Sequence, residues 1–244
     1  MQLEALAVRL RPRAPFEAAD LGIRLCQATL RSVYLCYAIA VVPLVLLAIA
    51  SSQFAAWLPM LLLWWAKPWL DRTILFVLSR AAFGQPTGPA DVWRAQQDVW
   101  WRHFGSTLTV RRFSLWRSLT QPVYQLEQFS ILNGAARIRQ IRHKHAASAM
   151  MMTSVFSATE TVLTVALVSL VFWLAPAGRA PELMDFFVGV EPQPLMWALP
   201  AAYIAAVLFL EPFYVASGFA MYLNRRAELE AWDIEQEFRR AFAH

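Results

Sequence analysis

Long apolar blocks with few or no charges alternate along this chain with segments that concentrate its basic and acidic residues. Val33 to Ala50 is a run of 18 uncharged residues, and Ser51 and Ser52 extend it to about 20, enough to cross the hydrocarbon core of a bilayer. The windows 155–175 and 195–223 are also strongly apolar, and each contains a single charged residue, Glu160 and Glu211 respectively. A soluble amphipathic helix would carry charges on every turn or two, so these blocks predict membrane-spanning helices.

The remaining apolar block, 54–79, is interrupted by charges. Its first half is too short to cross a bilayer alone, and Lys67, Asp71 and Arg72 follow it. Either the block is one tilted span with its charges buried against protein, or its charged half lies near the interface; we favour the single tilted span. Lys67 and Asp71 are four residues apart and would share a helix face, where they could neutralise each other.

These blocks predict an all-α, polytopic membrane protein that forms a single integral membrane domain over residues 1–244. Its composition agrees, because 58% hydrophobic and only 16% charged residues are too apolar for an ordinary soluble domain. About four transmembrane helices and additional cytoplasmic amphipathic helices are expected. The expected elements are a cytoplasmic amphipathic helix at 1–32, spans at 33–52, 54–79, 155–175 and 195–223, a basic cytoplasmic segment at 80–145, a periplasmic loop at 176–194 and a cytoplasmic helix at 224–244.

The distribution of charge predicts the orientation. Residues 80–145 contain ten Lys and Arg residues against three acidic residues, whereas the loop 176–194 contains one Arg and three acidic residues. Loops rich in Lys and Arg stay cytoplasmic, so this segment and both chain ends are expected on the cytoplasmic side. No signal peptide is expected, because residues 1–32 carry five Arg and three acidic residues without a short apolar core.

The basic segment contains two candidate interfacial elements. Asp91 to Phe104 mixes tryptophans with charges, and its apolar residues roughly follow helical spacing, which is typical of an interfacial amphipathic helix. Arg137 to Lys144 is a second basic patch that would attract anionic head groups. Plain cytoplasmic loops are the alternative for both. The head-group candidates are Arg94, Arg102, Arg137, Arg139, Arg142 and Lys144.

Ionisable residues inside the expected spans form the second group of candidates. Such residues are expensive in a bilayer and mark functional sites by default. They could form a paired cluster that holds the spans together, or they could line a polar cavity for a proton, an ion or a lipid head group. Glu211 is the sharpest case, since Pro212 frees an upstream carbonyl beside the carboxylate. The intramembrane candidates are Lys67, Asp71, Arg72, Glu160 and Glu211.

The sequence offers little support for catalysis, metals or cofactors. His143 and His145 are two residues apart in a basic patch, without the spacing of a metal site, and Cys26 and Cys36 lie at or inside the first apolar block. No G-x-S-x-G, H-E-x-x-H or phosphate-binding glycine loop is present. The basic residues lie beside apolar blocks, where membrane topology accounts for them, so nucleic-acid binding is not expected. We therefore expect no enzyme activity, no metal and no cofactor.

The two ends of the chain resemble a known group. The segment Leu10–Leu25 leading into Val41–Leu44, and the segment Glu211–Phe238, are similar to the ends of a loose group of bacterial polytopic inner-membrane proteins; Pro122–Glu127 is a further similar segment. That group is related to the membrane domain of glycerophosphoryl diester phosphodiesterase. The resemblance implies an inner-membrane location and association with envelope components, such as a MoxR-type AAA ATPase system or a transglutaminase-like protein. It implies no catalytic residues.

Two functional hypotheses follow. The first is a non-enzymatic subunit or scaffold of an envelope complex, which contacts anionic lipids and partner proteins at its cytoplasmic face and could form an oligomer. The alternative is a lipid or small-solute handling protein that uses the intramembrane acidic residues. The candidates for cytoplasmic docking are Arg225, Arg226, Glu228 and Asp233.

Overall fold

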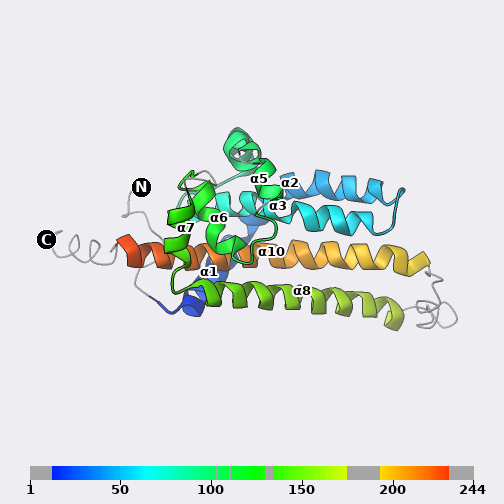
Figure 1. Cartoon of the computed structure of the whole chain (residues 1–244). Coiled ribbons are helices and arrows are strands. Elements are labelled where there is room, and N and C mark those ends of the chain that lie inside the picture. Colours follow the sequence, from blue (N-terminus) through cyan, green and yellow to red (C-terminus); the bar gives the residue numbers. More distant parts are fainter. Residues whose placement is uncertain (1–12, 103, 110, 130–133, 175–192, 231–244) are drawn as a thin grey trace.

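The computed structural model describes residues 13–102, 104–109, 111–129, 134–174 and 193–230, and no β-strand occurs in these ranges. Four long helices run alongside one another, and short helices cover one end of them (Figure 1). The helices are α1 (Pro15–Ala28), α2 (Leu30–Ser51), α3 (Leu58–Ala82), α4 (Pro89–Arg94), the π-helix η2 (Gln97–Trp101), α5 (Phe104–Leu108), α6 (Arg117–Gln125), α7 (Ala135–Arg142), α8 (Ala146–Leu174) and α10 (Gln193–Glu230).

Three of the helices are long and apolar enough to cross a membrane. They cover Leu30–Ser51 in α2, Ala146–Leu170 in α8 and Trp197–Glu230 in α10. Helix α3 differs, because every stretch of 18 residues within it contains Lys67, Asp71 and Arg72. The all-helical membrane architecture expected from the sequence is therefore present in the described residues, with three such helices in place of the four expected spans.

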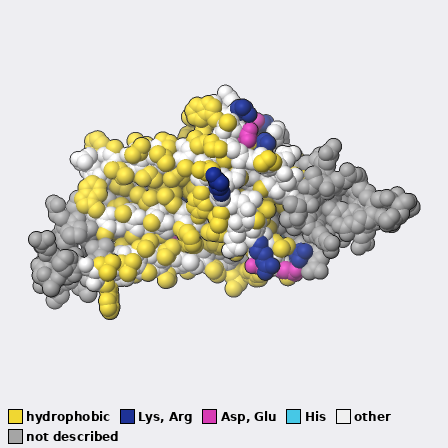
Figure 2. All heavy atoms as spheres, turned by 180° about the vertical axis from the view of Figure 1, so that it is seen from behind, with side chains coloured by type: hydrophobic (Ala, Val, Ile, Leu, Met, Phe, Trp, Pro, Cys, Tyr) yellow, Lys and Arg dark blue, Asp and Glu magenta, His cyan; other side chains and the backbone are white. Residues whose placement is uncertain are grey.

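Helix α3 is nevertheless one continuous helix from Leu58 to Ala82, with Pro68 inside it. Its first half is partly exposed at Leu61, Trp64 and Trp65, whereas most side chains of its second half are buried. It lies against α2, with the turn between them at the opposite end of the molecule from α6 and α7 (Figure 1). Seen from behind, hydrophobic side chains dominate the half towards that turn, and charged side chains gather over the other half (Figure 2). We call the half that contains α6 and α7 the polar end.

Helix α10 is the central element, with α1, α3, α6 and α8 packed against it. Close approach on two sides depends on glycine. A Cβ atom at Gly22 of α1 would overlap the backbone of Ala216, and one at Gly218 of α10 would overlap Ser118 of α6. The absence of a side chain at these positions lets α1 and α6 sit directly on the α10 backbone, so the polar end is built around this helix.

The interfacial helix expected over Asp91–Phe104 is broken into three pieces. Helix α4 ends at Arg94, a π-helical turn follows at Gln97–Trp101, and α5 begins at Phe104. The break rotates Trp100 into the protein, where its indole N–H donates to Thr73 Oγ1 at 2.9 Å. A single amphipathic helix is therefore wrong for this segment, because a buried Trp needs a hydrogen-bond acceptor and the π-turn places it beside one.

The other expected boundaries shift or fall outside the described residues. Helix α1 occupies 15–28 of the expected helix 1–32, and α8 begins at Ala146, well before residue 155. Helix α10 runs without interruption from Gln193 to Glu230, so no boundary separates the span 195–223 from the start of the segment 224–244. Most of the loop 176–194 and the end of the C-terminal helix, including Asp233, lie outside the described residues.

Candidate functional site

Charged side chains from four helices meet inside the bundle. Lys67 Nζ lies 2.5 Å from Glu160 Oε2 and 2.8 Å from Glu211 Oε2, which joins α3 to α8 and α10. Arg117 of α6 lies 2.9 Å from Asp71 Oδ2 and 2.6 Å from Glu211 Oε1. We call Lys67, Asp71, Arg117, Glu160 and Glu211 the ion-pair network. It contains two basic and three acidic residues, and Glu211 is shared by both bases.

The ion-pair network is almost completely removed from solvent. Asp71 has no exposed surface and Glu211 is 2% exposed. Charges in such a place are tolerated only when they are paired, and removal of one partner leaves an uncompensated buried charge. Pro212 follows Glu211 inside α10, as the sequence indicated. The network thus ties together helices that the sequence places far apart.

Four of the five intramembrane candidates come together in this network, and Arg72 does not. The Arg72 guanidinium donates to the carbonyls of Asp98 and Arg102, at 2.7 and 2.5 Å, on the other side of α3. Lys67 and Asp71 do not pair with each other as expected, since each finds a closer partner on another helix. Both differences arise because residues on neighbouring elements, which the local spacing does not reveal, compete for these charges.

Arg117 is the functional candidate that the sequence analysis missed. It lies in the basic segment 80–145, where its charge was attributed to topology. Its neighbours Ser118, Thr120 and Gln121 are also buried and polar, and the apolar residues of α6, Leu119, Pro122 and Val123, do not share a face with Arg117, so hydrophobic spacing does not mark Arg117 as an inward residue. The available signal was charge balance, because three acidic candidates faced only two basic ones within the expected spans.

A cavity of about 310 Å³ opens beside the ion-pair network. Lys67, Glu160 and Glu211 form its charged wall. Arg112 borders it as well, with its guanidinium 3.6 Å from the centroid of the Trp64 ring. We call this space the side cavity. Its remaining lining combines aromatic and hydroxyl side chains: Trp64, Phe113, Phe156, Tyr214, Ser114, Thr153 and Ser157, together with Leu115, Leu210 and Arg117.

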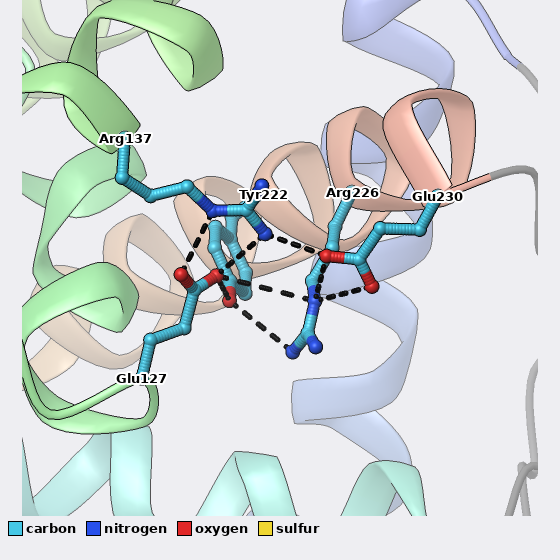
Figure 3. A network of polar contacts seen from close by, with 5 residues as sticks. All are labelled: Glu127, Arg137, Tyr222, Arg226 and Glu230. Carbon is cyan, nitrogen blue, oxygen red and sulfur yellow. Dashed lines mark hydrogen bonds and ion pairs between the residues drawn. The ribbon is translucent and has the colours of Figure 1, made fainter.

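A second polar network, which we call the terminal network, lies at the polar end (Figure 3). Arg137 holds both oxygens of Glu127, at 2.8 and 3.1 Å, and donates to Glu230 Oε1 at 2.6 Å. The Tyr222 hydroxyl donates to Glu127 Oε1 at 2.6 Å. Arg226 also belongs to this network, because its Nε lies 2.9 Å from Glu230 Oε1. Burial raises the pKa of Glu127, but the bonds from Arg137 and Tyr222 outweigh it and hold that pKa below its ordinary value.

The head-group candidates fall into exposed and occupied groups. Arg94 and Arg102 are exposed; they form ion pairs with Asp91 and Asp98 of their own segment, and Arg102 also donates to Gln128 Oε1 at 3.2 Å. Arg139 and Lys144 are also exposed. Arg137, in contrast, belongs to the terminal network, and Arg142 lies over the Trp116 ring at 3.5 Å. The last two side chains therefore stabilise the fold.

The docking candidates on α10 are used internally. Arg225 pairs with Glu228 at 2.8 Å, and Glu228 lies 3.3 Å from His145 Nε2 at the start of α8. Arg226 belongs to the terminal network. The Asn224 side chain of α10 also forms two hydrogen bonds with the backbone of Arg13, just before α1. These residues fasten the polar end together.

In the part of the chain that the structure describes, no three His, Cys, Asp or Glu side chains are arranged to hold a metal ion. Comparison of the chain with protein-family models, curated proteins and solved structures finds no match.

Proposed function

We propose that this protein is a non-enzymatic, four-span subunit or scaffold of a bacterial inner-membrane complex, with its polar end on the cytoplasmic side. Helix α3 completes the four spans, since it lies against α2 and shields its charges within the bundle. The resemblance at the chain ends supports a bacterial inner-membrane location. It also suggests the partner system, an envelope assembly with a MoxR-type AAA ATPase.

One observation carries this proposal. Beside the buried Trp100, the segment α4–α5 exposes Trp93 and Trp101 (58% and 57%) together with Arg94. Exposed tryptophans next to basic residues are typical of membrane interfaces and partner surfaces, where the ring meets lipid or protein and the cation meets phosphate. The charges of the ion-pair network, in contrast, pair with one another, which supports a mechanical role for that network.

The proposal is tested by isolating the full-length protein in native nanodiscs and identifying bound lipids and proteins by mass spectrometry. The wild type is expected to be enriched in anionic phospholipids and to retain defined partners. The variant Trp93→Ala/Arg94→Gln/Trp101→Ala is expected to lose both. Trp57→Ala is the matched control, because Trp57 is equally exposed (63%) but lies at the turn between α2 and α3. A wild type without lipid enrichment or partners would reject the scaffold.

The side cavity favours a second candidate, a protein that handles lipids or small solutes. Its volume suits part of an amphiphile, and Arg112 offers a guanidinium without a carboxylate partner among the described residues. Ser157→Trp is expected to fill the cavity and reduce the recovery of a bound amphiphile. Ser154→Trp on the exposed surface of the same helix is the control. Equal recovery from both variants would exclude this candidate.

A further inference from the structure

Two buried arginines beside the ion-pair network, Arg72 and Arg111, lack an acidic partner among the described residues. Arg72 is 2% exposed and Arg111 is 8% exposed. Neither forms an ion pair with a carboxylate in the described residues. Arg72 donates to the backbone carbonyl of Asp98, but the Asp98 carboxylate is exposed and pairs with Arg102. Arg111 lies against the Tyr124 ring, with its guanidinium carbon 3.5 Å from the ring centroid.

Several N–H groups of this region also lack an acceptor. Arg72 Nε, Arg111 Nε, Arg111 Nη2 and Gln121 Nε2 are buried without a hydrogen-bond partner among the described residues. The other two nitrogens of Arg72 are used, because they donate to backbone carbonyls and to Thr107. Buried donors are nearly always satisfied, so this concentration of free donors indicates an acceptor between them.

A small space lies where these side chains meet. Its volume is about 10 Å³, and it is lined by Arg72, Arg111 and Gln121, by Arg117 of the ion-pair network, and by Pro68, Thr107, Thr120, Tyr124 and Gln125. We call it the arginine pocket. A volume of that size holds the centre of one water-sized particle. It is too small for a nucleotide, an intact head group or a second side chain.

The charges distinguish water from an anion as the occupant. The ion-pair network has one acidic residue more than basic residues, and Arg72 and Arg111 add two positive charges at a pocket that Arg117 also borders. Together, these seven side chains carry one uncompensated positive charge, and Arg112, which has no carboxylate partner among the described residues, adds another. A buried guanidinium does not lose its proton at neutral pH, so the imbalance persists. Water would accept hydrogen bonds but would leave the charge unbalanced.

We propose that Arg72, Arg111 and Gln121 bind one monovalent anion of halide size. The anion would accept N–H bonds from all three side chains and would offset the positive charge at the arginine pocket. It would also join α3 to α6 and to the segment that follows α5, which places this site at the junction between the long helices and the polar end. The proposal does not depend on either proposed function.

Thermal unfolding of the full-length protein in detergent tests the site. The protein is prepared in sodium gluconate and titrated with sodium chloride or sodium phosphate at constant ionic strength, with tryptophan fluorescence as the readout. Chloride is expected to raise Tm saturably by about 5 °C, as binding to the native state alone requires. Phosphate is expected to have no saturable effect. A larger rise with phosphate would reject a halide-sized ligand, and no saturable rise with chloride would reject the site.

Two substitutions locate the effect. Gln121→Glu has nearly the same shape and places a carboxylate beside both arginines, so its Tm in gluconate is expected to match that of the wild type in chloride and to ignore added chloride. Arg111→Gln is expected to lose the chloride response, whereas Arg94→Gln, at an exposed arginine, keeps it. A full chloride response in Gln121→Glu would contradict the proposal.

Bromide provides a direct measurement that does not depend on whether the variants fold. Crystals of the wild type grown in bromide are expected to show an anomalous peak between the side chains of Arg72 and Arg111. A map with bromide peaks only at the protein surface would overturn the assignment.

Discussion

Three arginines that are close in the sequence occupy three different environments. Arg111 lies on Tyr124 at the arginine pocket, Arg112 lies on Trp64 at the side cavity, and Arg117 joins the ion-pair network. The excess of Lys and Arg that predicts a cytoplasmic segment counts all three equally, because it depends only on their position between apolar blocks. Their individual roles depend on which helix each side chain meets, so they emerge only from the tertiary structure.

Glu211 is the residue on which the ion-pair network depends most, because both Lys67 and Arg117 pair with it. Glu211→Gln keeps the shape and removes the carboxylate that both bases contact, so Lys67 keeps only Glu160 and Arg117 keeps only Asp71 as acidic partners within the network. We expect a loss of about 3–5 kcal/mol in the free energy of unfolding, as for other broken buried pairs. Thermal unfolding in detergent measures the effect.

The control for Glu211→Gln is Asp20→Asn on α1, where the carboxylate is 57% exposed and pairs with Arg24 on the same helix. Exposed pairs of this kind contribute little, so its Tm is expected to stay near that of the wild type. Equal destabilisation by the two substitutions would mean that the buried network contributes no more than a surface pair.

Glu127 makes the terminal network sensitive to acid. The bonds from Arg137 and Tyr222 lower its pKa in the folded state, so the folded protein binds fewer protons than the unfolded chain near that pKa. The resulting stabilisation is fully present at pH values above the pKa of the carboxyl in the unfolded chain, about 4.3, and it is lost as the pH falls through the lower pKa of the folded state. We expect Glu127→Gln to be less stable than the wild type at pH 7, and the two to converge at low pH. Chemical unfolding at a series of pH values measures this difference, and a constant difference would contradict it.

At the scale of helices, an apolar run of sufficient length is a strong signal. It predicted α2, α8 and α10, because a long uncharged stretch has few other places to reside than a bilayer. The signal weakened for α3, whose charges are neutralised by other helices, and failed for α4–α5, where a π-turn rotates Trp100 inward. The spacing of apolar residues reveals the buried face of a helix only when one face meets protein and the other meets water.

The contact between α1 and α10 depends on a glycine, which gives a prediction with a matched control. A Cβ at Gly22 would enter the space occupied by the Ala216 carbonyl, so Gly22→Ala must push α1 away from α10. We expect a destabilisation of about 1–3 kcal/mol from this overpacking. At Gly105 in α5, a Cβ would meet no atom within 4 Å.

Gly105→Ala is therefore expected to be neutral or slightly stabilising, since Ala favours a helix over Gly by up to about 1 kcal/mol. The two substitutions make the same chemical change and differ only in the neighbouring helix. Chemical unfolding of both variants checks the pair, and a lower stability for Gly105→Ala than for Gly22→Ala would contradict the packing of α1 on α10.

At the scale of the whole molecule, the two polar networks lie one after the other along α10. The ion-pair network lies at the middle of the long helices, and the terminal network lies further along α10, towards its end at Glu230 (Figures 1 and 3). Between them, α6 connects the two levels by contributing Arg117 to the first and by leading into Glu127. The chain thus passes from an apolar half to a half that is held together by polar contacts, with α10 common to both.

This arrangement gives a test of the four-span topology. If α3 crosses the membrane, the turn after α2 and the helix α7 must lie on opposite sides. Gln53 and Gln140 provide exposed positions at these two places. The native Cys26 and Cys36 are buried, so they add little background. In intact spheroplasts, Gln53→Cys is expected to react with a membrane-impermeant maleimide, whereas Gln140→Cys is expected to react only after the membrane is opened. Labelling of both positions from outside would mean that α3 does not cross, and labelling of Gln140→Cys alone would invert the orientation that the basic segment predicts.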